Sequence, residues 1–134
     1  MRNLKSVLVA FVLAAAAALP AAAAELATQK STDRGVTVAV TPQNLSGTVA
    51  NWDFKIVLDT HSADLSDDLM KTAVLVDGGG KRHTPAAWEG AGPGGHHREG
   101  ILRFQSIAPR PESVELQITR SGESAPRIFR WQLK

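Results

Sequence analysis

The segment Trp52 to Leu58 constrains the fold more strongly than any other part of the sequence. Trp52, Phe54, Ile56 and Leu58 are large and apolar, and most residues between them are polar. Successive side chains of a β-strand point to opposite faces, so this period of two predicts a strand with one buried face. The chain must therefore supply a second layer that packs against that face.

Further short strands are predicted on both sides of this segment, separated by turns rich in Gly and Pro. They span residues 36–40, 72–77, 81–84, 98–105, 113–119 and 127–133. The pattern predicts an all-β fold, a single immunoglobulin-like sandwich or a small barrel of six to seven short antiparallel strands. We place this domain at residues 35–134. Residues 25–34 are polar and without periodicity, and we expect them to form a flexible leader.

The first 24 residues have the three parts of a secretory signal peptide. Basic residues Arg2 and Lys5 precede an apolar run from Val7 to Leu19, and Ala22 and Ala24 form an A-x-A cleavage site. The run is shorter than the roughly 20 residues that a membrane span needs. We therefore expect residues 1–24 to be removed, leaving a periplasmic or secreted bacterial protein without a membrane span.

Cleavage would also change the charge of the protein. The full chain carries 15 Lys and Arg against 13 Asp and Glu, and Arg2 and Lys5 would leave with the signal peptide. The mature chain would then have no formal net charge, which argues against a nucleic acid as partner. It contains no Cys, so its core must form without disulfides.

Histidines outside the predicted strands form the candidate site. His61 follows the Trp52 strand, and His96 and His97 follow a Gly- and Pro-rich segment that precedes another strand. If consecutive strands alternate in direction, both segments lie at one end of the domain, together with Asp59 and Asp64. Imidazole and carboxylate ligands suit Cu(II), Zn(II) or Ni(II). This predicts a copper or zinc ion bound by His61 and by one or both of His96 and His97, with Asp59 or Asp64 as a fourth ligand or as a support for one.

An interaction module is the alternative that the sequence leaves open. Trp88 lies in a loop rich in Gly, and Trp and Arg are frequent in binding hot spots. Trp88 and Arg98 are therefore candidate contacts for a protein of the cell envelope, although Trp88 could equally close one end of the core. Arg98 could instead pair with a carboxylate.

Catalysis is the remote alternative. Residues 57–62 (VLDTHS) are similar to the Asp-Thr-Gly loop of aspartic proteases, in which two aspartates share a proton. His61, however, takes the place of the Gly that lets two such loops approach each other. The chain has no thiol nucleophile, no G-x-S-x-G motif and no phosphate-binding loop. We expect a binding protein that is not an enzyme.

Three segments together resemble a group of small exported bacterial β-sandwich proteins of unknown function. They are Trp52 to Ser62 with its LDTHS end, the P-x-x-W-x-G segment at 85–90, and the PGGHHR segment at 93–98. The resemblance covers residues 36–133. It implies a sandwich fold and carries no activity and no functional residues with it.

Overall fold

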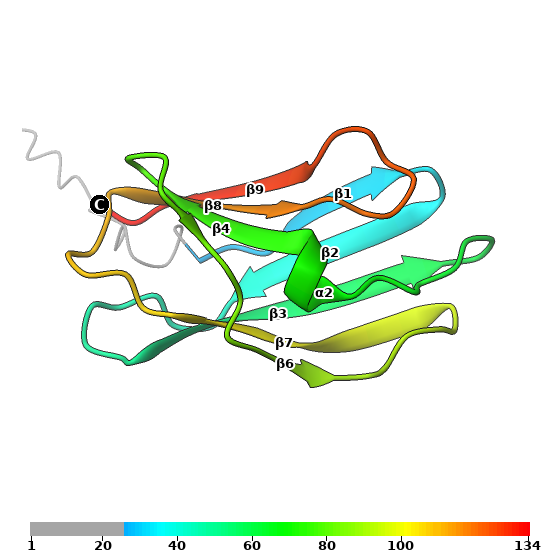
Figure 1. Cartoon of the computed structure of the whole chain (residues 1–134), viewed down its shortest axis with the longest axis horizontal. Coiled ribbons are helices and arrows are strands. Elements are labelled where there is room, and N and C mark those ends of the chain that lie inside the picture. Colours follow the sequence, from blue (N-terminus) through cyan, green and yellow to red (C-terminus); the bar gives the residue numbers. More distant parts are fainter. Residues whose placement is uncertain (1–25) are drawn as a thin grey trace, which may run out of the picture.

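Two antiparallel β-sheets pack face to face in the computed structural model, which describes residues 26–134 (Figure 1). The five-stranded sheet has the order β1-β2-β3-β7-β6 and the four-stranded sheet the order β5-β4-β8-β9. This confirms the predicted all-β sandwich. The predicted signal peptide, residues 1–24, lies outside the described residues.

The strand bounds follow the predicted alternation closely. The five-stranded sheet comprises β1 (Gln29–Asp33), β2 (Val36–Pro42), β3 (Asn51–Thr60), β7 (His97–Gln105) and β6 (Ala87–Gly90). The four-stranded sheet comprises β5 (Arg82–His83), β4 (Ala73–Asp77), β8 (Ser113–Ile118) and β9 (Arg127–Gln132). A single helical turn, α2 (Leu69–Thr72), is capped by the Asp68 side chain and leads into β4.

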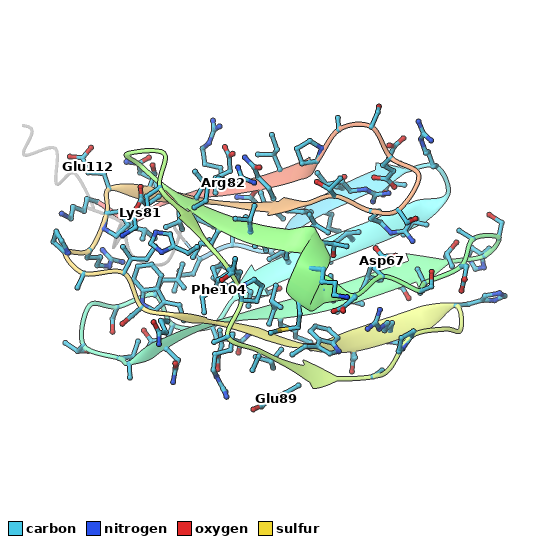
Figure 2. The ribbon with its side chains drawn as sticks, viewed as in Figure 1. Asp67, Lys81, Arg82, Glu89, Phe104 and Glu112 are labelled. Carbon is cyan, nitrogen blue, oxygen red and sulfur yellow. The ribbon has the colours of Figure 1, made fainter. Side chains whose placement is uncertain are left out.

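The core lies between the inner faces of the two sheets. Trp52, Phe54, Ile56 and Leu58 on β3 are all fully buried, as their alternation predicts. The centroid of the Phe54 ring lies 5.7 Å from that of Phe104, in an edge-to-face arrangement, and 5.6 Å from that of Trp131, in a tilted one. Figure 2 shows Phe104 between the two layers. Burial of this apolar face gives the sandwich its stability without disulfides.

The expectation of a flexible leader at residues 25–34 is wrong for most of that segment. Residues 29–33 form β1, which pairs with β2 from Gln29↔Val40 to Asp33↔Val36. The strand has no apolar alternation because it lies at the sheet edge with both faces largely exposed. The domain therefore begins earlier than residue 35.

The segment between the strands predicted at 81–84 and 98–105 also contains a strand. β6 pairs with β7 from Ala87↔Arg103 to Gly90↔Gly100. With β1 and β6 the described residues form nine strands, more than the six or seven expected. Both missed strands are short edge strands, which need no continuous apolar face.

Side chains close the gap between β1 and β9, at the edges of the two sheets. The Gln29 side-chain carbonyl accepts a hydrogen bond from the backbone N–H of Arg130 at 3.0 Å, and the Gln29 amide donates to the Arg130 carbonyl. The guanidinium of Arg127 donates to the carbonyls of Ser31, at 3.1 Å, and Asp33, at 2.9 Å. Side chains thus join the edges of β9 and β1, although no backbone hydrogen-bond ladder connects the two strands.

Candidate functional site

Three of the four histidines meet at one end of the sandwich, where β3 ends and β7 begins (Figure 1). They line a pocket of about 540 Å³ that we call the histidine pocket. Its lining residues are Thr32, Gly35, Thr37, Asp59, Thr60, His61, His96 and His97. The two loops predicted to share one end of the domain therefore do so.

Pairing between β3 and β7 sets the geometry of this pocket. The register places Asp59 directly opposite His97, and the Thr60 N–H donates to the His96 carbonyl at 2.9 Å. Directly opposed residues in an antiparallel pair have their side chains on the same face. Asp59 and His97 both point away from the core, because their neighbours Leu58 and Arg98 are buried.

Thr60 fixes the start of the loop that carries His61. Its hydroxyl donates to the Gly35 carbonyl at 2.9 Å and accepts from the N–H groups of Ser62, at 3.2 Å, and Ala63, at 3.0 Å. The side chain is only 5% exposed. These hydrogen bonds form a turn that ends β3, and His61 therefore lies in the turn beside the pocket and not in the strand.

Two glycines shape the other loop. Gly94 and Gly95 both have positive φ, of 110° and 76°, which most residues with a side chain adopt only at a cost. The Gly94 N–H donates to the Leu65 carbonyl at 3.0 Å and joins this loop to the segment after β3. His96 and His97 thus enter β7 from a tight turn that is tied to the rest of the pocket.

His97 and Asp59 form the closest polar contact of the site. The Nδ1 atom of His97 lies 2.5 Å from Oδ1 of Asp59. An ionised carboxylate only accepts hydrogen bonds, so Nδ1 carries the proton and donates it. This bond, and the negative charge behind it, raise the pKa of His97 above its ordinary value of 6.5. Asp59 therefore fixes both the tautomer and the orientation of the ring.

Glu99 is a member of the site that the sequence analysis missed. Its Oε2 atom lies 3.5 Å from Nε2 of His97, and both side chains are more than half exposed. His97 and Glu99 are two residues apart on β7, so they share its outer face. The H-x-E spacing could have indicated this pair, had the strand been predicted to begin at His97.

The other predicted ligands are arranged less tightly. His61 and His96 are exposed at the mouth of the pocket, and neither side chain makes a hydrogen bond within residues 26–134. Asp64 lies outside the histidine pocket, in a neighbouring depression lined by Arg120. In the part of the chain that the structure describes, no three His, Asp or Glu side chains converge on one point as a complete metal centre.

The side chains of Trp88 and Arg98 pack against each other. The Arg98 guanidinium lies 5.4 Å from the centroid of the Trp88 ring, and both side chains donate to the Ala91 carbonyl. Trp88 is partly buried against the core, while Arg98 is only 3% exposed. Within residues 26–134 the Arg98 guanidinium pairs with no carboxylate, and its other hydrogen bonds go to the carbonyls of Leu65 and Asp67. It holds the loop after β3 in place.

A buried chain of alternating charges supports the same end of the domain. Arg120 binds both carboxylate oxygens of Asp67, at 2.8 and 3.1 Å, and lies 3.5 Å from Glu123. Glu123 in turn binds Arg127 through both of its oxygens, at 3.0 and 2.8 Å. All four side chains are at most 7% exposed. This network was not predicted, since charged residues in turns are usually solvated.

Comparison with protein-family models, with curated proteins and with solved structures finds no match to this chain. Within residues 26–134, no helix has the length and apolar character required to cross a bilayer.

Proposed function

We propose that this chain is an exported, periplasmic binding protein that binds a divalent transition-metal ion, Zn(II) or Cu(II), at the outer end of β7. The observation that carries the proposal is the arrangement of His97 between two carboxylates. Asp59 occupies Nδ1, and Nε2 is left facing Glu99 at 3.5 Å. Ligating histidines commonly donate their second ring N–H to a carboxylate in this way.

The distance between His97 and Glu99 suits two ligands of one ion. Bonds of about 2.0–2.1 Å to nitrogen and oxygen, applied to atoms 3.5 Å apart, give an angle of about 117° at the ion. A tetrahedral site requires a similar angle. Nε2 of His97 and Oε2 of Glu99 therefore provide a two-ligand nucleus, and Asp59 acts as the orienting group behind it.

A third ligand would come from the loops beside the nucleus. His61 and His96 line the same pocket as His97, and both are exposed and free to change side-chain rotamer. Rotation of either imidazole toward His97 would complete three protein ligands and leave a position for water. Borderline N and O ligands of this kind favour Zn(II) and Cu(II) over Mg(II) or Ca(II).

Metal titration of the untagged protein, followed by calorimetry and by thermal unfolding, tests this proposal. An ion that binds only the folded state raises the unfolding free energy by about 2.7 kcal/mol at 100 times its Kd. We expect His97→Ala and Glu99→Gln to weaken binding of Zn(II) at least tenfold, and Asp59→Asn to weaken it about 10–100-fold through the lost orientation.

His83→Ala is the matched control, because it removes one histidine at the other end of the sandwich. His83 pairs with Asp77 at 3.1 Å and does not line the histidine pocket. Binding should survive this substitution unchanged. Equal losses in His83→Ala and His97→Ala, or no saturable binding of either ion, would overturn the proposal and leave the interaction module as the better hypothesis.

A further inference from the structure

A second pocket of about 570 Å³ lies at the opposite end of the sandwich, and we call it the distal pocket. It is formed by the turn after β4 and by residues 106–112, which connect β7 to β8. The Ser106 N–H in its wall donates to the Ala50 carbonyl, beside the first residue of β3. The pocket is therefore separated from the histidine pocket by the length of β3.

The walls of the distal pocket are apolar on one side. Ile107, Ala108, Pro109 and Pro111 line it, and Ile107 also packs on the core. Arg110 ties this loop to the body of the domain, because its Nε donates to the Leu45 carbonyl at 2.8 Å and its Nη1 to the Leu133 carbonyl. The apolar wall is thus held in place by the core and by two neighbouring segments.

Three basic residues line the same pocket. Lys81, Arg110 and Lys134 line the pocket, and none of them forms an ion pair within residues 26–134. Figure 2 shows Lys81 and Glu112 at this end of the molecule.

The side-chain carboxylates of Asp77 and Glu112 also line the pocket, and they differ in how many hydrogen bonds they accept. Asp77 accepts hydrogen bonds from the N–H groups of Gly79 and Lys81 and pairs with His83. These contacts hold the pKa of Asp77 below its ordinary value, and they occupy its oxygens with donors from the protein itself. Glu112 forms no ion pair among the described residues, so its negative charge would repel an anionic ligand in this pocket.

We propose that the distal pocket binds a small organic carboxylate with an apolar body. The apolar body would lie on Ile107 and the two prolines, and the carboxylate would face Lys81 and Arg110. Pockets that take small ligands are commonly about 300–1,000 Å³, with apolar walls and a few polar groups that set the orientation. The inference is independent of the metal proposal, since the two sites share no residue.

Titration of the ¹⁵N-labelled protein with benzoate tests the inference, with benzamide as the neutral analogue of the same shape. We expect benzoate to cause saturable shifts confined to residues 77–83 and 106–112, and benzamide to bind at least tenfold more weakly. Lys81→Gln should weaken benzoate binding about fivefold, the size expected of a partly exposed ion pair. Glu112→Gln should strengthen it, because that change removes a repelling charge.

Lys55→Gln is the control with the same change in net charge, since Lys55 is exposed on β3 and does not line the pocket. Its affinity for benzoate should match that of the unaltered protein. Shifts that do not saturate, equal responses to benzoate and benzamide, or equal losses in Lys81→Gln and Lys55→Gln would each overturn the inference.

Discussion

Gly90 and Gly100 face each other across β6 and β7 so closely that a Cβ atom on Gly90 would lie 2.4 Å from the Cα of Gly100. A Cβ on Gly100 would lie 2.7 Å from the Glu89 carbonyl oxygen and equally close to Cζ2 of Trp88. The two glycines therefore form the surface on which the Trp88 ring rests. Because backbone atoms make part of this contact, a larger residue cannot be accommodated by a side-chain rotation alone.

Gly100→Ala is expected to lower the free energy of unfolding by about 1–3 kcal/mol, the usual cost of overpacking. Urea denaturation measures the change. Gly92→Ala is the control, since a Cβ at Gly92 would meet no atom within 4 Å. Equal stability of the two variants would contradict the close packing of β6 on β7.

Asp59→Asn is expected to lower the pKa of His97 toward its ordinary value of 6.5, because the bond to Asp59 is the largest cause of the upward shift. Glu99→Gln should lower it by a smaller amount, since that carboxylate lies farther from the ring. An NMR titration of the His97 ring protons measures both. A pKa that is the same in Asp59→Asn and the unaltered protein would show that the two side chains do not pair in solution.

Asp67→Asn is expected to destabilise the fold by about 3–5 kcal/mol, because it leaves the buried guanidinium of Arg120 with only the longer contact to Glu123. The double substitution Asp67→Leu with Arg120→Met removes both charges and should recover much of that loss. Denaturant unfolding of the three proteins measures the difference. A single variant as stable as the unaltered protein would mean that water reaches the pair.

Glu123 should make the stability depend on pH on the acidic side. Its bond to Arg127 holds its pKa below the ordinary value of 4.5, so the stabilisation is complete above that pH. It is lost as the pH falls through the lowered value, because protonation breaks the pair. The stability difference between the unaltered protein and Glu123→Gln should therefore shrink as the pH falls below about 4.5.

Chemical denaturation at a series of pH values measures this difference. Glu112→Gln is the control, because Glu112 is exposed and forms no ion pair in residues 26–134. Its difference from the unaltered protein should not change in this way. A Glu123→Gln difference that is constant from neutral to acidic pH would contradict a buried ionised pair.

The strands that could be predicted are those with one solvent-exposed face and one buried face. β3 alternates without interruption and was placed within two residues at each end, because burial of its inner face leaves the sequence no other pattern. β1 and β6 could not be found in this way. Gln29–Asp33 has no apolar residue, and Ala87–Gly90 lies among prolines and glycines, so the pairing of both strands depends on neighbours distant in sequence.

The candidate site was predictable as a location but not as a set of contacts. Alternating strand directions place His61 and His96 at one end whatever the register. The pairing of Asp59 with His97 requires the register of β3 on β7, and a shift by one residue would turn one side chain to the other face. The buried positions of Arg98 and Arg120 depend on carbonyls and a carboxylate of the segment after β3, which no local pattern records, whereas Glu123 lies only four residues before Arg127.

The contact between Gln29 and Arg130 joins residues near the two ends of the described chain. This contact forms only when the outer edge of β1 meets the outer edge of β9, so it closes the seam between the two sheets. Before it forms, β1 and β9 each present an unpaired strand edge to other chains, and closing the seam removes these two edges from intermolecular strand pairing.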